Sequence, residues 1–180
     1  MKPQILLLAL SLACTSAWAD EDVSKVNGKI SADAGKTYGA LETVNGSIEI
    51  GAGAQTKNVE TVNGGIRIGD NARTGGVETV NGSIGLVGTE LGKGIETVNG
   101  DITVGVGSHV RGGIEVSKPS FGFSFQPSRK PRVVIGPDAV VDGPLHFERE
   151  VNLYVHRSAK IGAVSGATAR SFDSDVAPKD

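Results

Sequence analysis

The sequence predicts an all-β protein: a single-stranded parallel β-solenoid (β-helix) with rungs of about 18 residues. The first observation is a repeat. Glu-Thr-Val-Asn-Gly at residues 42–46 returns unchanged at 60–64, 78–82 and 96–100, and Val-Asn-Gly at 26–28 keeps the same eighteen-residue step. A fixed period of this length is typical of solenoids, in which each repeat forms one turn. The second observation is that no proline occurs between residues 20 and 118, as a continuous ladder of backbone hydrogen bonds requires.

Aliphatic residues recur at fixed positions of the repeat and are expected to fill the interior. Ile48 and Ile50 flank Glu49, and this alternation is the period of a strand with one face inward. Most of the residues in these columns are β-branched, which suits pleated strands. The columns are Leu41, Val59, Val77, Ile95; Val26, Val44, Val62, Val80, Val98; Ile30, Ile48, Ile66, Ile84, Ile102; and Ile50, Ile68, Leu86, Val104.

Asn-Gly is expected to turn the chain at a corner between two faces, because both residues tolerate positive φ. If the turns stack in register, the asparagine side chains form a ladder along one edge, with each amide bonded to the next. The ladder would consist of Asn27, Asn45, Asn63, Asn81 and Asn99. The register of the sixth rung stays open, because Glu115 follows Glu96 by nineteen residues whereas Val116 follows Val98 by eighteen.

The first 19 residues have the pattern of a secretory signal peptide, with Lys2, an apolar run at 5–13 and small residues at Ala17 and Ala19. The mature chain would be exported to the periplasm or the cell exterior. It would contain no cysteine, hence no disulfide, and 17 Lys and Arg against 20 Asp and Glu, a formal charge of −3. This acidity argues against nucleic-acid binding. No further apolar stretch is long enough to span a membrane.

We expect one solenoid domain at residues 20–168, an insertion at 117–132 and a disordered tail at 169–180. The insertion is rich in proline, phenylalanine and basic residues and contains no acid, which suits contact with an anionic lipid or an acidic polymer. A flexible loop without a partner is the alternative. The candidate contact residues are Lys118, Phe121, Phe123, Phe125, Arg129, Lys130 and Arg132. Phe147 and Tyr154 are expected to close the end of the solenoid, since terminal repeats are atypical.

The rungs resemble those of two groups of bacterial proteins. The repeat Thr-Val-Asn-Gly-Ser-Ile at 43–48 resembles repeats of secreted adhesin-like proteins with β-strand repeats. The stretch Ile-Gly-Pro-Asp-Ala-Val-Val-Asp-Gly at 135–143 is similar to rungs of bactofilins, which are polymer-forming scaffold proteins. The resemblance covers residues 24–167 and implies a right-handed β-helix. Bactofilins are mostly cytoplasmic, whereas this chain carries an export signal.

No catalytic, cofactor-binding or metal-binding residue is predicted, and no cofactor. A divalent cation such as Ca²⁺ could bridge the stacked carboxylates of one column, although a solvated edge that opposes aggregation explains them without a ligand. That column consists of Glu42, Glu60, Glu78 and Glu96. His146 and Glu148 lack a third metal ligand. The uneven spacing of the aliphatic columns argues against a hexapeptide acyltransferase.

These observations predict a non-enzymatic, exported structural or adhesive protein of the bacterial envelope. Near-identical rungs make the two ends complementary, so end-to-end stacking of the protein with itself is expected. The alternative is a monomeric binding module that uses the basic insertion or a flat Thr/Asn face to bind an envelope glycan or an anionic lipid. A carbohydrate-active β-helix enzyme is a more distant alternative.

Overall fold

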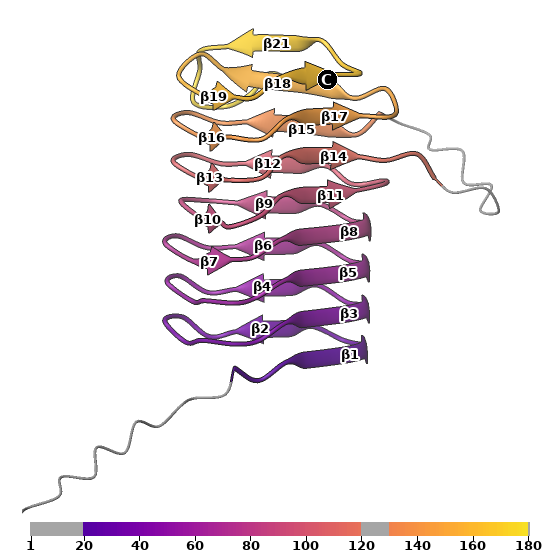
Figure 1. Ribbon diagram of the computed structural model, residues 1–180, viewed down its shortest axis with the longest axis vertical. Coiled ribbons are helices and arrows are strands. Elements are labelled where there is room, and N and C mark those ends of the chain that lie inside the picture. Colours follow the sequence, from indigo (N-terminus) through magenta and orange to yellow (C-terminus); the bar gives the residue numbers. More distant parts are fainter. Residues whose placement is uncertain (1–19, 120–129, 180) are drawn as a thin grey trace, which may run out of the picture.

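The structure of the protein, a computed structural model, describes residues 20–119 and 130–179. It confirms the predicted fold class, a parallel β-solenoid of about eight turns stacked in chain order (Figure 1). Strands on three sides of the turns pair with their counterparts above and below, and these pairs are parallel. The described residues contain no helix that could span a membrane. The predicted signal peptide lies outside the described residues.

Three sheets, which we call A, B and C, run along the axis. Sheet A consists of β1 (Val23–Asn27), β3 (Leu41–Asn45), β5 (Val59–Asn63), β8 (Val77–Asn81), β11 (Ile95–Thr97), β14 (Ile114–Val116), β17 (Leu145–Phe147) and β20 (Val164–Ser165). Sheet B consists of β2 (Ile30–Ala32), β4 (Ile48–Ile50), β6 (Ile66–Ile68), β9 (Ile84–Leu86), β12 (Ile102–Val104), β15 (Arg132–Ile135), β18 (Asn152–His156) and β21 (Ala169–Phe172). Sheet C consists of β7 (Arg73–Thr74), β10 (Glu90–Leu91), β13 (His109–Val110), β16 (Val140–Val141) and β19 (Lys160–Ile161).

The interior is a narrow column of aliphatic side chains enclosed by the three sheets. Isoleucines of sheet B, such as Ile48 and Ile66, are completely buried, as predicted. In sheet A the Leu41 column is buried, as predicted, but beyond it Thr43 is buried and Val44 is exposed. The prediction that the valine column points inward is therefore wrong. A flat outward Thr/Asn face does not exist either, since the threonines face the core.

The inward threonines follow from strand alternation and one hydrogen bond. Leu41, at the start of β3, is fully buried, so a period of two places Thr43 inward and Val44 outward. A buried hydroxyl needs a partner. Thr61 Oγ1 finds one by donating to the carbonyl oxygen of Gly46, at the corner of the preceding turn, at 3.0 Å. Threonine thus adds a bond between turns that valine could not make.

The glycine of each Asn-Gly corner is required by the close stacking of backbones. A Cβ atom on Gly46 would lie 2.0 Å from the carbonyl oxygen of Gly28, and one on Gly64 would lie 1.9 Å from that of Gly46. No side chain fits at such a separation. Positive φ, the reason expected from the sequence, occurs in this glycine column only at Gly28, with φ of 104°.

Strand β14 decides the register that the sequence left open. Glu115 pairs with Glu96 and Val116 with Thr97, so this turn takes nineteen residues. After β14 the chain leaves the stack and returns as β15, which pairs with β12 (Figure 1). The described ends of the insertion predicted at 117–132 therefore lie between two turns, with Arg132 already part of β15, and the sheets are continuous across it. Its residues 120–129 are outside the described part of the chain.

The solenoid extends beyond its predicted C-terminal limit. Residues Ala169–Phe172 form β21, which pairs with β18, so the prediction of a disordered tail from residue 169 is wrong for this strand. The strand has no aliphatic pattern that the sequence could reveal. Phe172 instead packs with Val134 and Tyr154 in a small cluster apart from the core. Tyr154 therefore does not close the end, whereas Phe147 lies within the core.

Candidate binding face

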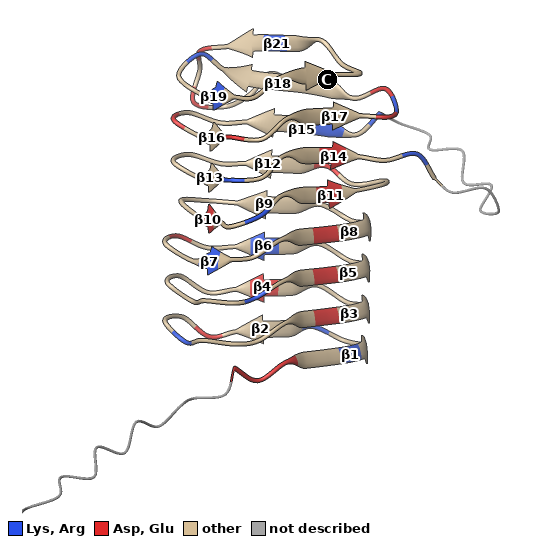
Figure 2. Cartoon of the chain, in the orientation of Figure 1, with Lys and Arg blue, Asp and Glu red and all other residues tan. Residues whose placement is uncertain are grey.

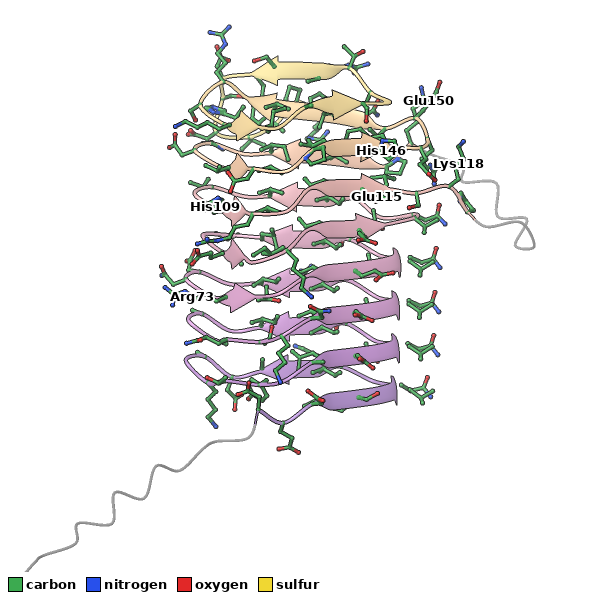
Figure 3. The ribbon with its side chains drawn as sticks, in the orientation of Figure 1. Arg73, His109, Glu115, Lys118, His146 and Glu150 are labelled. Atoms are coloured by element: carbon green, nitrogen blue, oxygen red, sulfur yellow. The ribbon has the colours of Figure 1, made fainter. Side chains whose placement is uncertain are left out.

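The first outward column of sheet A is acidic. Strand pairing places its five glutamates in register on successive turns, with Ser24 before them and His146 after them. We call these five residues the acidic column: Glu42, Glu60, Glu78, Glu96 and Glu115. Figure 2 shows the column as red bands on β3, β5 and β8 that continue on β11 and β14, and Figure 3 labels Glu115 and His146 at its end. Glu115 joins the column because its turn takes nineteen residues.

The acidic column lacks counter-ions. Its five carboxylates form no ion pair within residues 20–119 and 130–179, although Glu115 Oε1 accepts a hydrogen bond from Ser117 Oγ at 3.3 Å. Several acids on other faces are paired with cations. Glu90 of sheet C, for example, contacts both Arg73 and Arg111. The acidic column is therefore a row of carboxylates on successive turns that no cation neutralises in the described residues.

The pKa values follow these surroundings. Burial raises the pKa of Glu78 above its usual value, and the charges of Glu96 and Glu60 add to this effect. The pKa of Glu49 on sheet B is lowered, chiefly because a hydrogen bond from Lys29 stabilises the ionised carboxylate. Ionisation of Glu78 is thus opposed by burial and by the charges of Glu96 and Glu60, and a ligand that donates hydrogen bonds to these carboxylates would relieve the repulsion.

The second outward column of sheet A is apolar. Val26, Val44 and Val62 are 67%, 41% and 40% exposed. A shallow groove of about 220 Å³ is lined by both columns. Depressions of about 210 and 260 Å³ lie along the acidic column beside Gly76, Gly94 and Gly113, which precede the sheet A strands. A linear ligand that follows the axis would therefore meet a carboxylate and a valine side chain on each of three successive turns, those of β3, β5 and β8. We call the acidic column together with Val26, Val44, Val62 and Val80 the acid–valine face.

The asparagine column borders this face at the corner between sheets A and B. Each side-chain amide donates to the carbonyl oxygen of the asparagine one turn earlier, at 3.1, 2.9, 3.1 and 3.1 Å. The members are Asn27, Asn45, Asn63, Asn81 and Asn99. At the last member, Arg149 Nη1 donates to Asn99 Oδ1 and, at 3.0 Å, to the carbonyl oxygen of Val98. Sequence reasoning missed Arg149, because no local pattern links it to a residue 50 positions away.

The insertion residues proposed for partner contact are only partly described. Phe121, Phe123, Phe125 and Arg129 lie outside the described residues. Lys130 Nζ pairs with Glu150 Oε2 at 2.8 Å, and the Arg132 guanidinium lies 4.6 Å from the centre of the Tyr154 ring. The backbone amide of Lys118 donates to Glu148 Oε2 at 3.0 Å. The side chains of Lys130 and Arg132 thus have separate local partners, and Lys118 is held through its backbone.

The histidines do not converge on a common site. His109 Nε2 shares a hydrogen bond with Asp142 Oδ2 at 2.7 Å, and His146 Nδ1 shares one with Ser165 Oγ at 2.8 Å. In the part of the chain that the structure describes, no three His, Cys, Asp or Glu side chains are arranged to hold a metal ion.

No family model, no curated protein and no solved structure matches this chain. The structure shows the solenoid architecture that the rung resemblance implied. The likeness to adhesin-like repeats and to bactofilins rests on the rung sequences alone.

Proposed function

We propose that the protein is an exported structural or adhesive module of the bacterial envelope, and that the acid–valine face is its adhesive surface for an envelope polysaccharide. The observation that carries this proposal is the register of the face, which presents the same Glu and Val pair at the same place on successive turns. A polymer with a regular repeat can engage such a face many times.

The chemistry of the face suits a hydroxyl-rich polymer. An ionised carboxylate accepts hydrogen bonds through two oxygens and so binds two sugar hydroxyls. The neighbouring valine methyl groups offer apolar contact to the C–H faces of sugar rings. Adjacent turns lie roughly 4.8 Å apart, so successive carboxylates meet successive parts of an extended chain. Each contact is weak, but several contacts on one rigid rod combine through multivalency.

End-to-end stacking, the other assembly that the repeats suggested, requires complementary ends. The two end turns do not match. The first turn keeps the eighteen-residue pattern, with Val23 aligned with Leu41, whereas the last sheet B step, from Leu153 to Ala169, is shorter. The geometry therefore favours lateral binding over extension of the rod.

Co-sedimentation of the protein with purified peptidoglycan sacculi, over a range of protein concentrations, tests the proposal. The test variant carries Glu60→Gln, Glu78→Gln and Glu96→Gln. The matched control changes the same number of charges elsewhere, with Glu49→Gln, Glu90→Gln and Glu150→Gln. We expect the test variant to bind at least about tenfold more weakly, because hydrogen bonds to charged groups contribute about 1.5–3 kcal/mol each. Equal binding by the three proteins, or no binding by the wild type, refutes the proposal.

Two further readouts separate the alternatives. Reducing sugar released from the sacculi during incubation would support a carbohydrate-active enzyme. Binding to vesicles that contain an anionic lipid, and its loss when Lys118, Lys130 and Arg132 are changed to Gln, would support the insertion as the binding site.

A further inference from the structure

In the first turn of the solenoid, the backbone carbonyl of Lys29 is one of those that point away from the stack. In later turns the carbonyl that precedes each sheet B strand accepts a hydrogen bond from the turn before: Ser47 O accepts from Ile30 N, and Gly65 O accepts from Ile48 N, both at 3.0 Å. Lys29 O holds the same position in the first turn. No turn precedes it in the described residues, so this acceptor lacks the partner that the repeat supplies elsewhere.

The amide of Asp33 is the corresponding donor. Its counterparts one and two turns later, Gly51 N and Gly69 N, donate to Ala32 O and Ile50 O of the preceding turn, both at 2.9 Å. Asp33 N has no such carbonyl below it in the described part of the chain. Unpaired edge groups of this kind are templates for pairing with another chain.

Two side chains of the first turn satisfy both groups. Lys25 Nζ donates to Lys29 O at 2.9 Å, and Asp33 N donates to Tyr38 Oη at 3.0 Å. Lys25 is aligned with Thr43, which faces the interior one turn later, and Tyr38 packs against the core. From these positions the two side chains bond to the groups that point off the end of the stack.

The apolar end of the core is closed as well. Ile30 and Ala32 of β2 are only 2% and 3% exposed, although no turn lies beyond them in the described residues. At the opposite end, Ala169 and Ser171 of β21 are exposed. The two ends of the solenoid are therefore built differently, and only the first has its strand of sheet B covered.

We infer that the first turn is a cap, which closes the sheet B edge at this end of the solenoid against a further strand or a second copy of the chain. A solenoid that docked here would break both cap hydrogen bonds and would bury the ammonium group of Lys25, and an unpaired buried charge is costly. Inward-pointing charge is a general means of protecting a sheet edge. This inference does not depend on the ligand of the acid–valine face.

The test uses the protein expressed from the full sequence. Tyr38→Phe removes the acceptor for Asp33 N and should raise the hydrogen-exchange rate of that amide roughly 2- to 12-fold, the factor that corresponds to the net free energy of one hydrogen bond. Lys25→Met together with Tyr38→Phe removes both cap bonds and keeps most of the apolar volume. By sedimentation velocity, this double variant should associate more strongly than the wild type at equal concentration.

Lys29→Met is the matched control. It removes one positive charge from the same turn, but the Lys29 side chain bonds to Glu49 and takes no part in the cap. It should match the wild type in both experiments. An unchanged exchange rate of the Asp33 amide in Tyr38→Phe would overturn the inference. A double variant that keeps its circular dichroism spectrum and sediments like the wild type would overturn it too.

Discussion

Two buried threonines in successive turns differ in a way that predicts opposite effects of the same substitution. Thr79 and Thr97 are aligned in sheet A and both are buried. Thr79 Oγ1 donates to Gly64 O at 3.2 Å, whereas Thr97 Oγ1 has no hydrogen-bond partner in the described residues. The backbone beside Thr97 also differs: Gly64 N donates to Asn81 O at 3.0 Å, whereas the described residues contain no corresponding bond from Gly82 N to Asn99 O. The corner that the earlier threonines use has therefore shifted.

Replacement of each threonine by valine should separate these two situations. Thr97→Val should stabilise the protein by about 1 kcal/mol or more, because leaving a buried polar group unpaired costs about 1–3 kcal/mol. Thr79→Val should destabilise it by about 1 kcal/mol, the net contribution of a typical hydrogen bond. The added methyl group is the same in both cases. A difference of roughly 2 kcal/mol therefore reports the hydrogen bond and not the change in hydrophobicity.

Urea unfolding followed by circular dichroism measures both values, from the midpoint and slope of each transition. The slopes must agree between variants, because a repeat protein can unfold in parts and the free energies are comparable only if the transition is the same. If Thr97→Val destabilises the protein as much as Thr79→Val does, the argument from the unpaired hydroxyl is refuted.

Two further predictions concern the surface columns. Burial raises the pKa of Glu78 above its usual value, so ionisation of this carboxyl disfavours the folded state at pH 7 and no longer does so at acidic pH, where the carboxyl is protonated. Glu78→Gln should therefore stabilise by roughly 0.2–1 kcal/mol at pH 7 and have little effect at pH 4, and an equal gain at both pH values would contradict this. Asn63→Ala removes hydrogen bonds to Asn45 and Asn81 and should cost about 1–2 kcal/mol in thermal unfolding; an unchanged Tm would show that the ladder adds no net stability.

The repeat itself predicted most of the fold, because an eighteen-residue period with isoleucines at constant positions allows few structures other than stacked turns. The phase of sheet A was not predictable from hydrophobicity, since Val44 is more apolar than Thr43. The signal was Leu41, whose burial decides which of its neighbours faces inward. Strand β21 was missed because its pairing with β18 depends on backbone groups and on Phe172, and not on an aliphatic pattern.

The residues of the candidate face and of the cap could be predicted from the sequence only in part. Four glutamates of the acidic column were visible in the sequence, but Glu115 joined them only when the register of its turn was known. Lys25 departs from the threonine that later repeats carry at its position. The role of Lys25 could be inferred only from the structure, which shows that its ammonium group bonds to Lys29 O. The structure also shows that no turn precedes this one in the described residues. Register and neighbours in space are the information that one sequence lacks.

Arg149 has a consequence for the whole asparagine corner. A guanidinium group can only donate hydrogen bonds, so Asn99 must turn its carbonyl oxygen toward Arg149 and its amino group toward Asn81. The same orientation is then imposed on each asparagine down to Asn27. The amide dipoles add head to tail like the peptide dipoles of an α-helix, with a cation at the negative pole, and each bond polarises the next. One edge of the rod therefore carries a row of aligned amide dipoles, and the positive end of this row lies at Asn27.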